Sequence, residues 1–165
     1  MSTHLLFALL LLGPASPTPK ASPGSALWSP PSIRVSRPSF DAVILDLSPL
    51  NNTPDVSGTQ HWCPSPEQVV SAEAGMAVFL RGSLAWQSPR IRADLNRYKR
   101  QYVGFVRDGR RLIYIQFFHP ESRPVRDGSW ATSFMTIMGG GDYFFRLLYD
   151  PEKKRHFDVW VNAPK

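Results

Sequence analysis

Cysteine is almost absent from this chain of 165 residues, in which Cys63 is the only one. A single thiol cannot form an internal disulfide, so the fold must be held by its hydrophobic core. It also excludes the paired cysteines of structural zinc sites. The four histidines are scattered singly, without HExxH spacing, and we therefore expect no bound metal and no cofactor.

Sequence motifs of the common enzyme classes are also missing. The chain contains no GxSxG, SxxK or Walker-type loop. The nearest approach to a reactive pair is His61 and Cys63, which would share one face if they lay on a strand. We favour a plain loop ahead of a helix, because no third orienting group can be named. We expect no catalytic residue, and a non-catalytic protein fits the sequence better than an enzyme does.

Long hydrophobic runs are limited to one, from Leu5 to Leu12, which is too short to span a bilayer. Small residues and proline follow it, so residues 1–21 read as a secretory signal peptide whose cleavage site the sequence does not define. Its first residues lack Lys and Arg, which leaves an apolar N-terminal helix as the alternative. The mature protein is then expected to be periplasmic or extracellular.

Proline is abundant, with 16 residues that gather near the N-terminus. Residues 22–39 are rich in Pro and Ser and lack an apolar period, so we predict an extended linker there. Residues 40–165 are predicted to form a single domain.

Acidic residues are too few to balance the basic ones, and the formal net charge is +6. The excess concentrates between residues 90 and 111. A polyanionic partner is compatible with this charge, whereas nucleic acid is disfavoured by export and by the absence of an aromatic-rich recognition motif. The basic residues in this stretch are Arg90, Arg92, Arg97, Lys99, Arg100, Arg107, Arg110 and Arg111.

The segment 66–81 carries the strongest helix signal. Ser65 suits the N-cap, Pro66 the first helical position and Gln68 the capping box, and Gly82 follows as a stop. An apolar stripe at helical spacing runs along this segment, so one face must cover a sheet or another helix. The stripe comprises Val69, Ala72, Met76, Phe79 and Leu80.

Two alternating runs flank Asp108-Gly109, a pair typical of a two-residue hairpin turn. With that turn, Arg107 faces Arg110, and the register follows outward. The core face of the hairpin is then Tyr102, Val106, Ile113, Ile115 and Phe117. The opposite face is apolar in part, and it carries Gln101, Val103, Phe105, Leu112, Tyr114 and Gln116.

Further strands are predicted at 40–47, 131–138, 142–150 and 155–163. The glycines of "MGGGDYFF", residues 138–145, then connect two strands as a turn or bulge, with Asp142 as a local hydrogen-bonding partner. The predicted fold class is α+β: one amphipathic helix packed on a curved antiparallel sheet of four to five strands, a cystatin-like architecture. A small β-barrel with a helical lid is the alternative.

The segments 100–120 and 139–163 resemble a pattern found in uncharacterised exported bacterial proteins. In that pattern an RQYVG hairpin is followed by a GG, YDP and terminal VN ending. The resemblance implies a shared fold and export and implies no activity. Gln101-Tyr102-Val103-Gly104 is also similar to the Gln-x-Val-x-Gly loop of cystatin inhibitors, but the glycine comes one residue early and the segment lies within a predicted strand. Protease inhibition is therefore not favoured.

The outer face of the predicted hairpin is the candidate binding surface. It brings aromatic and basic side chains together in Phe105, Arg107, Arg110 and Tyr114. We expect an envelope protein or another anionic envelope component as the partner. Coverage of this face by a second copy or by the N-terminal segment is the alternative. The second hypothesis is a small ligand-binding protein or hydrolase with a pocket between helix and sheet.

Overall fold

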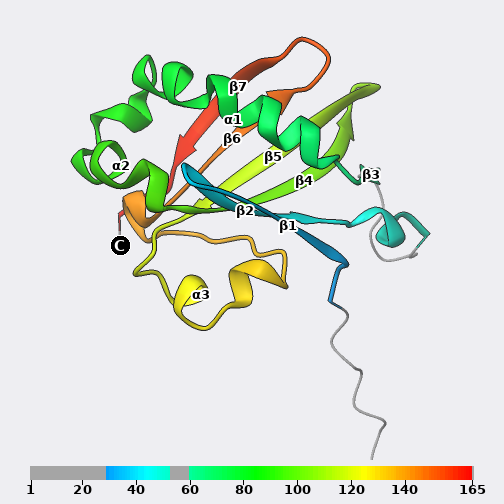
Figure 1. The fold of residues 1–165 in the computed structure, drawn as a ribbon, viewed down its shortest axis with the longest axis horizontal. Helices are drawn as coiled ribbons and strands as arrows, with labels where there is room; N and C mark the ends of the chain where they lie inside the picture. The colour runs from blue at the N-terminus through cyan, green and yellow to red at the C-terminus, as the bar shows by residue number, and fades with distance from the viewer. Residues whose placement is uncertain (1–28, 53–59, 165) are drawn as a thin grey trace, which may run out of the picture.

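The computed structural model describes residues 29–52 and 60–164, which form one open sheet with helices on both sides (Figure 1). Helices α1 and α2 lie over one face, and the short helix α3 lies on the other side. The helices are α1 (Pro66–Arg81), α2 (Pro89–Asp94) and α3 (Arg123–Arg126). The strands are β1 (Ser32–Arg37), β2 (Phe40–Leu45), β3 (His61–Trp62), β4 (Lys99–Arg107), β5 (Arg110–Phe118), β6 (Phe144–Asp150) and β7 (Arg155–Val161).

The sheet runs in the order β1-β2-β4-β5-β6-β7, and β3 pairs with the far end of β4. All neighbouring strands are antiparallel except β2 and β4, which are parallel. A parallel pair needs a long crossover, and the chain between β2 and β4 supplies it with α1 and α2. The predicted α+β fold is confirmed, with more strands than the four to five expected. The barrel alternative is wrong, because the sheet is open.

Helix α1 begins and ends where the sequence predicts. The Ser65 hydroxyl accepts a hydrogen bond from the Gln68 backbone N–H, and the Gln68 side chain accepts one from the Ser65 backbone. This capping box satisfies two N–H groups that a helix cannot pair internally. Gly82 ends the helix by donating to the last carbonyls.

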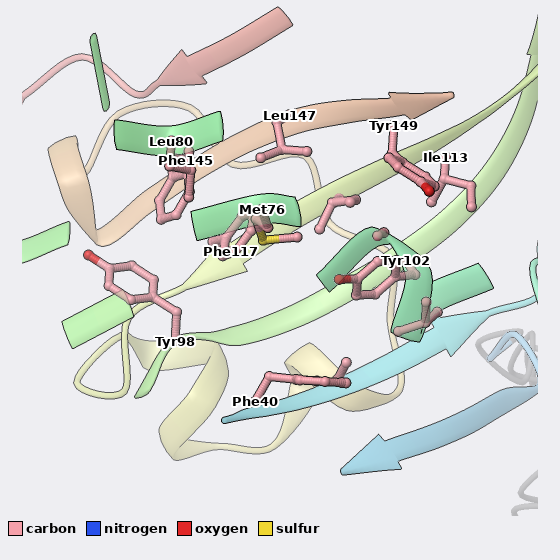
Figure 2. Packing of buried hydrophobic residues seen from close by; sticks show 14 of the residues in the cluster. Phe40, Met76, Leu80, Tyr98, Tyr102, Ile113, Phe117, Phe145, Leu147 and Tyr149 are labelled. Carbon is pink, nitrogen blue, oxygen red and sulfur yellow. The ribbon is translucent and has the colours of Figure 1, made fainter. Parts of the chain in front are cut away.

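The apolar stripe of α1 packs on the inner face of the sheet, and together they make the main core (Figure 2). Met76 and Leu80 point from the helix toward Phe117 and Phe145, whose rings stack with centroids 4.0 Å apart. Phe79, predicted within the stripe, is only partly buried. Sheet residues of this core include Ala42, Ile44, Tyr102, Ile113, Ile115, Phe117, Phe145, Leu147 and Tyr149.

A buried ion pair joins α1 to β4 within this apolar interface. The Arg100 Nε lies 2.8 Å from the Glu73 carboxylate, and the Tyr102 hydroxyl donates to the same carboxylate oxygen at 2.6 Å. Arg100 also donates to the Tyr98 and Leu95 carbonyls at 2.7 and 3.1 Å. Removing one partner of a buried pair leaves an uncompensated charge. This cluster therefore sets where α1 sits on the sheet.

The β4–β5 hairpin has the predicted register, with Arg107 opposite Arg110 and Tyr102 opposite Ile115. Asp108 and Gly109 both have positive φ, as a two-residue hairpin turn requires. The hairpin therefore turns toward α1 the face that the alternation of apolar residues predicts as the core side, and the opposite face is the predicted outer one.

The predicted linker 22–39 needs a correction at its C-terminal end. Residues 32–37 form strand β1, which pairs with β2 along its whole length. Only Val35 of this strand is buried, so its composition resembles that of a linker although it belongs to the sheet. The predicted signal peptide and the linker up to residue 28 lie outside the described residues.

The strand predicted at 131–138 is wrong. This segment runs extended across the outer face of the sheet, with Ala131 in a short 3-10 turn, and joins no strand ladder. Its side chains alternate between partly buried and exposed because every second one packs on the sheet. The Gln101 amide, which lies on that face, donates to the Trp130 carbonyl and to the Ser133 carbonyl.

The glycine loop after this segment turns the chain, but it does not connect two strands as predicted, because β6 follows it and no strand immediately precedes it. Gly139, Gly140 and Gly141 all have positive φ. Gly140 excludes larger residues for two reasons. Its φ is positive, and a Cβ at this position would lie 2.8 Å from the Phe144 ring. The prediction for Asp142 was wrong: its carboxylate accepts from the distant Ser88 hydroxyl at 2.7 Å and pairs with Arg90.

We expect Gly104→Ala to destabilise the fold by about 1–3 kcal/mol. A Cβ at this position in β4 would lie 2.3 Å from the backbone oxygen of Trp62 in β3, so β3 must move. Urea unfolding measures the loss. Gly82→Ala is the matched control, because its Cβ would meet only the Phe79 carbonyl at 3.6 Å. Equal midpoints for the two variants would contradict the prediction.

Candidate functional site

The outer face of the sheet is hollowed where the segment 123–137 does not cover it. We call this hollow, of about 440 Å³, the outer groove. It lies over β4, β5, β6 and β7, on the side opposite α1. Its lining residues are Phe105, Arg107, Tyr114, Arg146, Leu147, Leu148, Asp158, Val159 and Trp160.

Three of the four predicted site residues line the outer groove, namely Phe105, Arg107 and Tyr114. Arg110 does not line it. Arg110 instead pairs with Asp150, whose carboxylate also accepts the backbone N–H groups of Glu152 and Lys153 at 3.0 Å. Arg110 therefore joins the turn end of the β4–β5 hairpin to the β6–β7 turn, a structural role that hairpin register alone does not reveal.

Aromatic rings form the walls of the outer groove. The Tyr114 ring meets Phe134 edge to face, with centroids 6.0 Å apart. Trp160 is 59% exposed, which is unusual for the largest apolar side chain. Burial raises the pKa of Tyr114, so its hydroxyl stays protonated and donates to the Gln116 side chain at 3.1 Å.

Two guanidinium groups lie against these rings. Arg107 stands over Phe105 at 5.8 Å, and Arg146 stands over Trp160 at 5.5 Å. Within the described part of the chain, Arg146 has no carboxylate partner, and Arg107 has only a long contact of 3.5 Å to Asp158. Both members of that contact are about half exposed or more, at 46% and 63%, so the pair is weak.

A β-bulge brings Asp158 to the outer groove. The β6–β7 register shifts between Arg146 and Leu148, and Asp158 takes a positive φ of 53°. A bulge inserts an extra residue and re-aims a side chain. The only sequence signal for Arg146 is its place in a predicted hairpin, whereas Trp130 and Trp160 are candidates for addition to the aromatic binding surface. The bulge had no signal, because Asp158 is not a glycine.

Trp130 does not reach the outer groove. It is buried in a second core under the segment 123–137, together with Val43, Leu45, Val103 and Phe118. This core covers one part of the outer face, and the outer groove lies on the part that it leaves open.

No contact joins the side chains of His61 and Cys63 in the described residues, and the exposed Cys63 thiol is directed to the Pro64 carbonyl at 3.7 Å. Partial burial and the nearby Asp46 raise the pKa of Cys63, and burial lowers the pKa of His61. Both shifts favour the neutral forms, whereas a thiolate-imidazolium pair needs the charged ones. The loop interpretation holds only from Cys63 onward, because His61 and Trp62 form strand β3 and pair with β4.

The two histidines nearest the C-terminus have structural contacts. His119 accepts the Glu121 backbone N–H through Nδ1 and contacts Asp94 through Nε2 at 3.3 Å. His156 contacts the Ala72 carbonyl of α1 through Nε2 at 2.8 Å and stacks on Phe79. Among the described residues, no group of three or more His, Cys, Asp or Glu side chains converges as a metal site would require.

Comparison of the chain with protein-family models, with curated proteins and with solved structures finds no match. No helix within residues 29–52 and 60–164 is long and apolar enough to cross a membrane. The site must therefore be interpreted from its own geometry.

We expect Cys63 to react slowly with a thiol reagent at pH 6 to 7, because its raised pKa leaves little thiolate. The labelling rate of the folded chain should fall below that of the same chain in urea. A folded chain that labels faster than the unfolded one at pH 6 would instead indicate an activated thiolate.

His156 should make the stability depend on pH. Burial lowers its pKa in the folded state, whereas the unfolded value is near 6.5. The unfolded chain then binds a proton that the folded chain does not, so stability is full above about pH 6.5 and falls below it, by up to about 1.4 kcal/mol per pH unit. Urea midpoints measured from pH 8 to pH 5 test this.

The matched variant is His156→Gln, which keeps a donor toward the Ala72 carbonyl and does not titrate. The pH dependence of the wild-type chain minus that of the variant isolates His156 from all other groups. Identical slopes in the two proteins would show that His156 does not contribute.

Proposed function

We propose that this protein is an exported, non-catalytic binding protein that holds an extended acidic segment of a partner protein in its outer groove. The observation that carries the proposal is the pairing of two weakly engaged guanidinium groups with three aromatic side chains in one open hollow. Interface centres are enriched in arginine and aromatic residues, because both bury much area and pair with specific partners.

The electrostatics of the outer groove favour an anionic ligand. Arg146 has no carboxylate partner in the described residues, and Arg107 could exchange its long contact with Asp158 for a closer one. A guanidinium binds a carboxylate with two parallel hydrogen bonds, which gives direction as well as energy. The excess of basic residues over the whole chain would also speed the approach of an acidic partner.

A protein segment fits this groove better than a densely charged polymer or membrane surface. Asp158 stands among the basic groups and would repel closely spaced phosphates or sulfates. An extended peptide carries its charges on alternate residues, about 7 Å apart, and can place an apolar side chain between them. The groove also borders β7, an edge strand of the sheet, where a peptide can add as a further strand.

The export part of the proposal rests on the N-terminal sequence, where a short apolar run precedes the Pro- and Ser-rich stretch. Pairing of two copies through this face is less favourable, because it would bring Arg107 and Arg146 of both chains together in a protein of net charge +6.

Titration of the full chain with a fluorescent peptide that alternates Glu and Val tests the proposal. We expect saturable binding that weakens as salt is added, because the contacts are exposed ion pairs. Arg107→Ala and Arg146→Ala should each weaken binding about fivefold, which corresponds to about 1 kcal/mol.

The control variant replaces Arg123 and Arg126, which lie on α3 and do not line the outer groove. It removes the same number of charges, and its affinity should equal that of the wild-type chain. If the control and the Arg107/Arg146 double variant lost the same affinity for the peptide, the loss would come from the change in net charge and not from the outer groove. Binding of a Lys-Val peptide as tight as that of the Glu-Val peptide, or no binding of the Glu-Val peptide, would overturn the proposal.

A further inference from the structure

A second hollow lies on the helix side of the sheet, far from the outer groove in the fold. It is a crevice of about 430 Å³ between α1, the turn that joins β1 to β2, and the chain entering β4. Pockets of this size accept small ligands. It is lined by Arg37, Pro38, Ser39, Phe40, Val70, Glu73, Ala74, Met76, Ala77, Leu95, Asn96 and Arg100.

The polar end of the crevice is the buried Glu73–Arg100 pair. One carboxylate oxygen of Glu73, Oε1, meets both the Tyr102 hydroxyl and the Arg100 Nε. No hydrogen bond from a described residue reaches the other oxygen, Oε2. The Glu73 side chain is 11% exposed and lines the crevice, whereas Arg100 is 2% exposed. Glu73 thus retains an unused acceptor on a mostly buried side chain that lines the crevice.

The outer end of the crevice is basic. The Arg37 side chain donates to the Ser36 carbonyl at 2.9 Å, and within the described residues it has no carboxylate partner. Between the two ends the walls are apolar, formed by Phe40, Val70 and Leu95 among others. Since Glu73 and Arg100 cancel, the charged groups lining the crevice sum to one positive charge, that of Arg37.

We propose that this crevice binds a small monoanionic carboxylate with an apolar body and a hydroxyl group at its far end. The carboxylate meets Arg37 at the mouth, the body lies along Phe40 and Val70, and the hydroxyl donates to Glu73 Oε2. A monoanion neutralises the single excess charge of the site. A hydroxyl satisfies the free acceptor without adding charge to a buried region.

An amine is a poorer fit at either end. At the mouth it would face the Arg37 guanidinium, and at depth it would bring a second cation beside Arg100, which lies 2.8 Å from the carboxylate it would share. A ligand without the hydroxyl that fills the crevice displaces water from Glu73 Oε2 and leaves this oxygen unpaired. Recognition by a group that must be satisfied is more selective than apolar contact alone.

Three probes of similar size separate these contributions: para-hydroxyphenylpropionate, phenylpropionate and tyramine. Calorimetric titration of the full chain should give the tightest binding for the first probe. Phenylpropionate should bind about tenfold more weakly, because it lacks the hydroxyl donor, and tyramine should show no saturable binding. Equal affinity of the first two probes would overturn the role of Glu73, and tight tyramine binding would overturn that of Arg37.

Two variants test the placement. Arg37→Ala should weaken para-hydroxyphenylpropionate about fivefold or more, whereas Arg123→Ala, which removes the same charge elsewhere, should leave its affinity unchanged. Val70→Trp should abolish binding by filling the crevice, and it should fold normally because Val70 is 41% exposed on α1. Full affinity in Val70→Trp, or absence of binding in the wild-type chain, would overturn the proposal.

The crevice and the outer groove lie on opposite faces, so the two proposals fail separately. The Arg107/Arg146 double variant should bind para-hydroxyphenylpropionate with wild-type affinity. A loss of affinity in that variant would place the ligand in the outer groove and overturn the crevice site.

Discussion

The buried pair of Glu73 and Arg100 is the interaction on which the arrangement of this protein depends. It lies where α1 crosses the start of β4, and Tyr102 and the carbonyls of Leu95 and Tyr98 add hydrogen bonds to it. Breaking a buried pair by removing one partner typically costs about 3–5 kcal/mol, because the remaining charge has no water around it. The apolar stripe of α1 packs on the sheet around this pair, so the pair adds a directional contact to the hydrophobic burial.

The place of α1 on one face leaves the other face to be covered by something else. The segment 123–137 covers part of it with Trp130 and its neighbours, and the Gln101 side chain fixes that segment by donating to the Trp130 and Ser133 carbonyls. The uncovered part keeps its aromatic and arginine side chains at the surface. The outer groove and the crevice have the same kind of origin. The segment 123–137 on one face and helix α1 on the other are each narrower than the sheet they cover.

Local sequence signals predicted the elements whose interactions are local. The capping box of α1 and the Asp108-Gly109 turn involve residues a few positions apart, so composition and spacing were enough. The strand prediction failed at 131–138. An extended segment that lies on a sheet shows the same alternation of buried and exposed side chains as a strand within the sheet. The linker prediction failed at residues 32–37, because an edge strand with one buried residue resembles a linker in composition.

The sequence by itself determined the fold class, the helix and the hairpin faces, and it placed three of the four candidate residues where the outer groove lies. Only the tertiary structure decided which of the arginine side chains are paired with a carboxylate. Arg107, Arg110 and Arg146 are equivalent in the sequence, but distant carboxylates give them different surroundings: Asp150 engages Arg110 closely, Asp158 engages Arg107 loosely, and no described carboxylate reaches Arg146. Ion pairs between residues about 40 to 50 positions apart form only after the strands have paired, so they leave no local pattern.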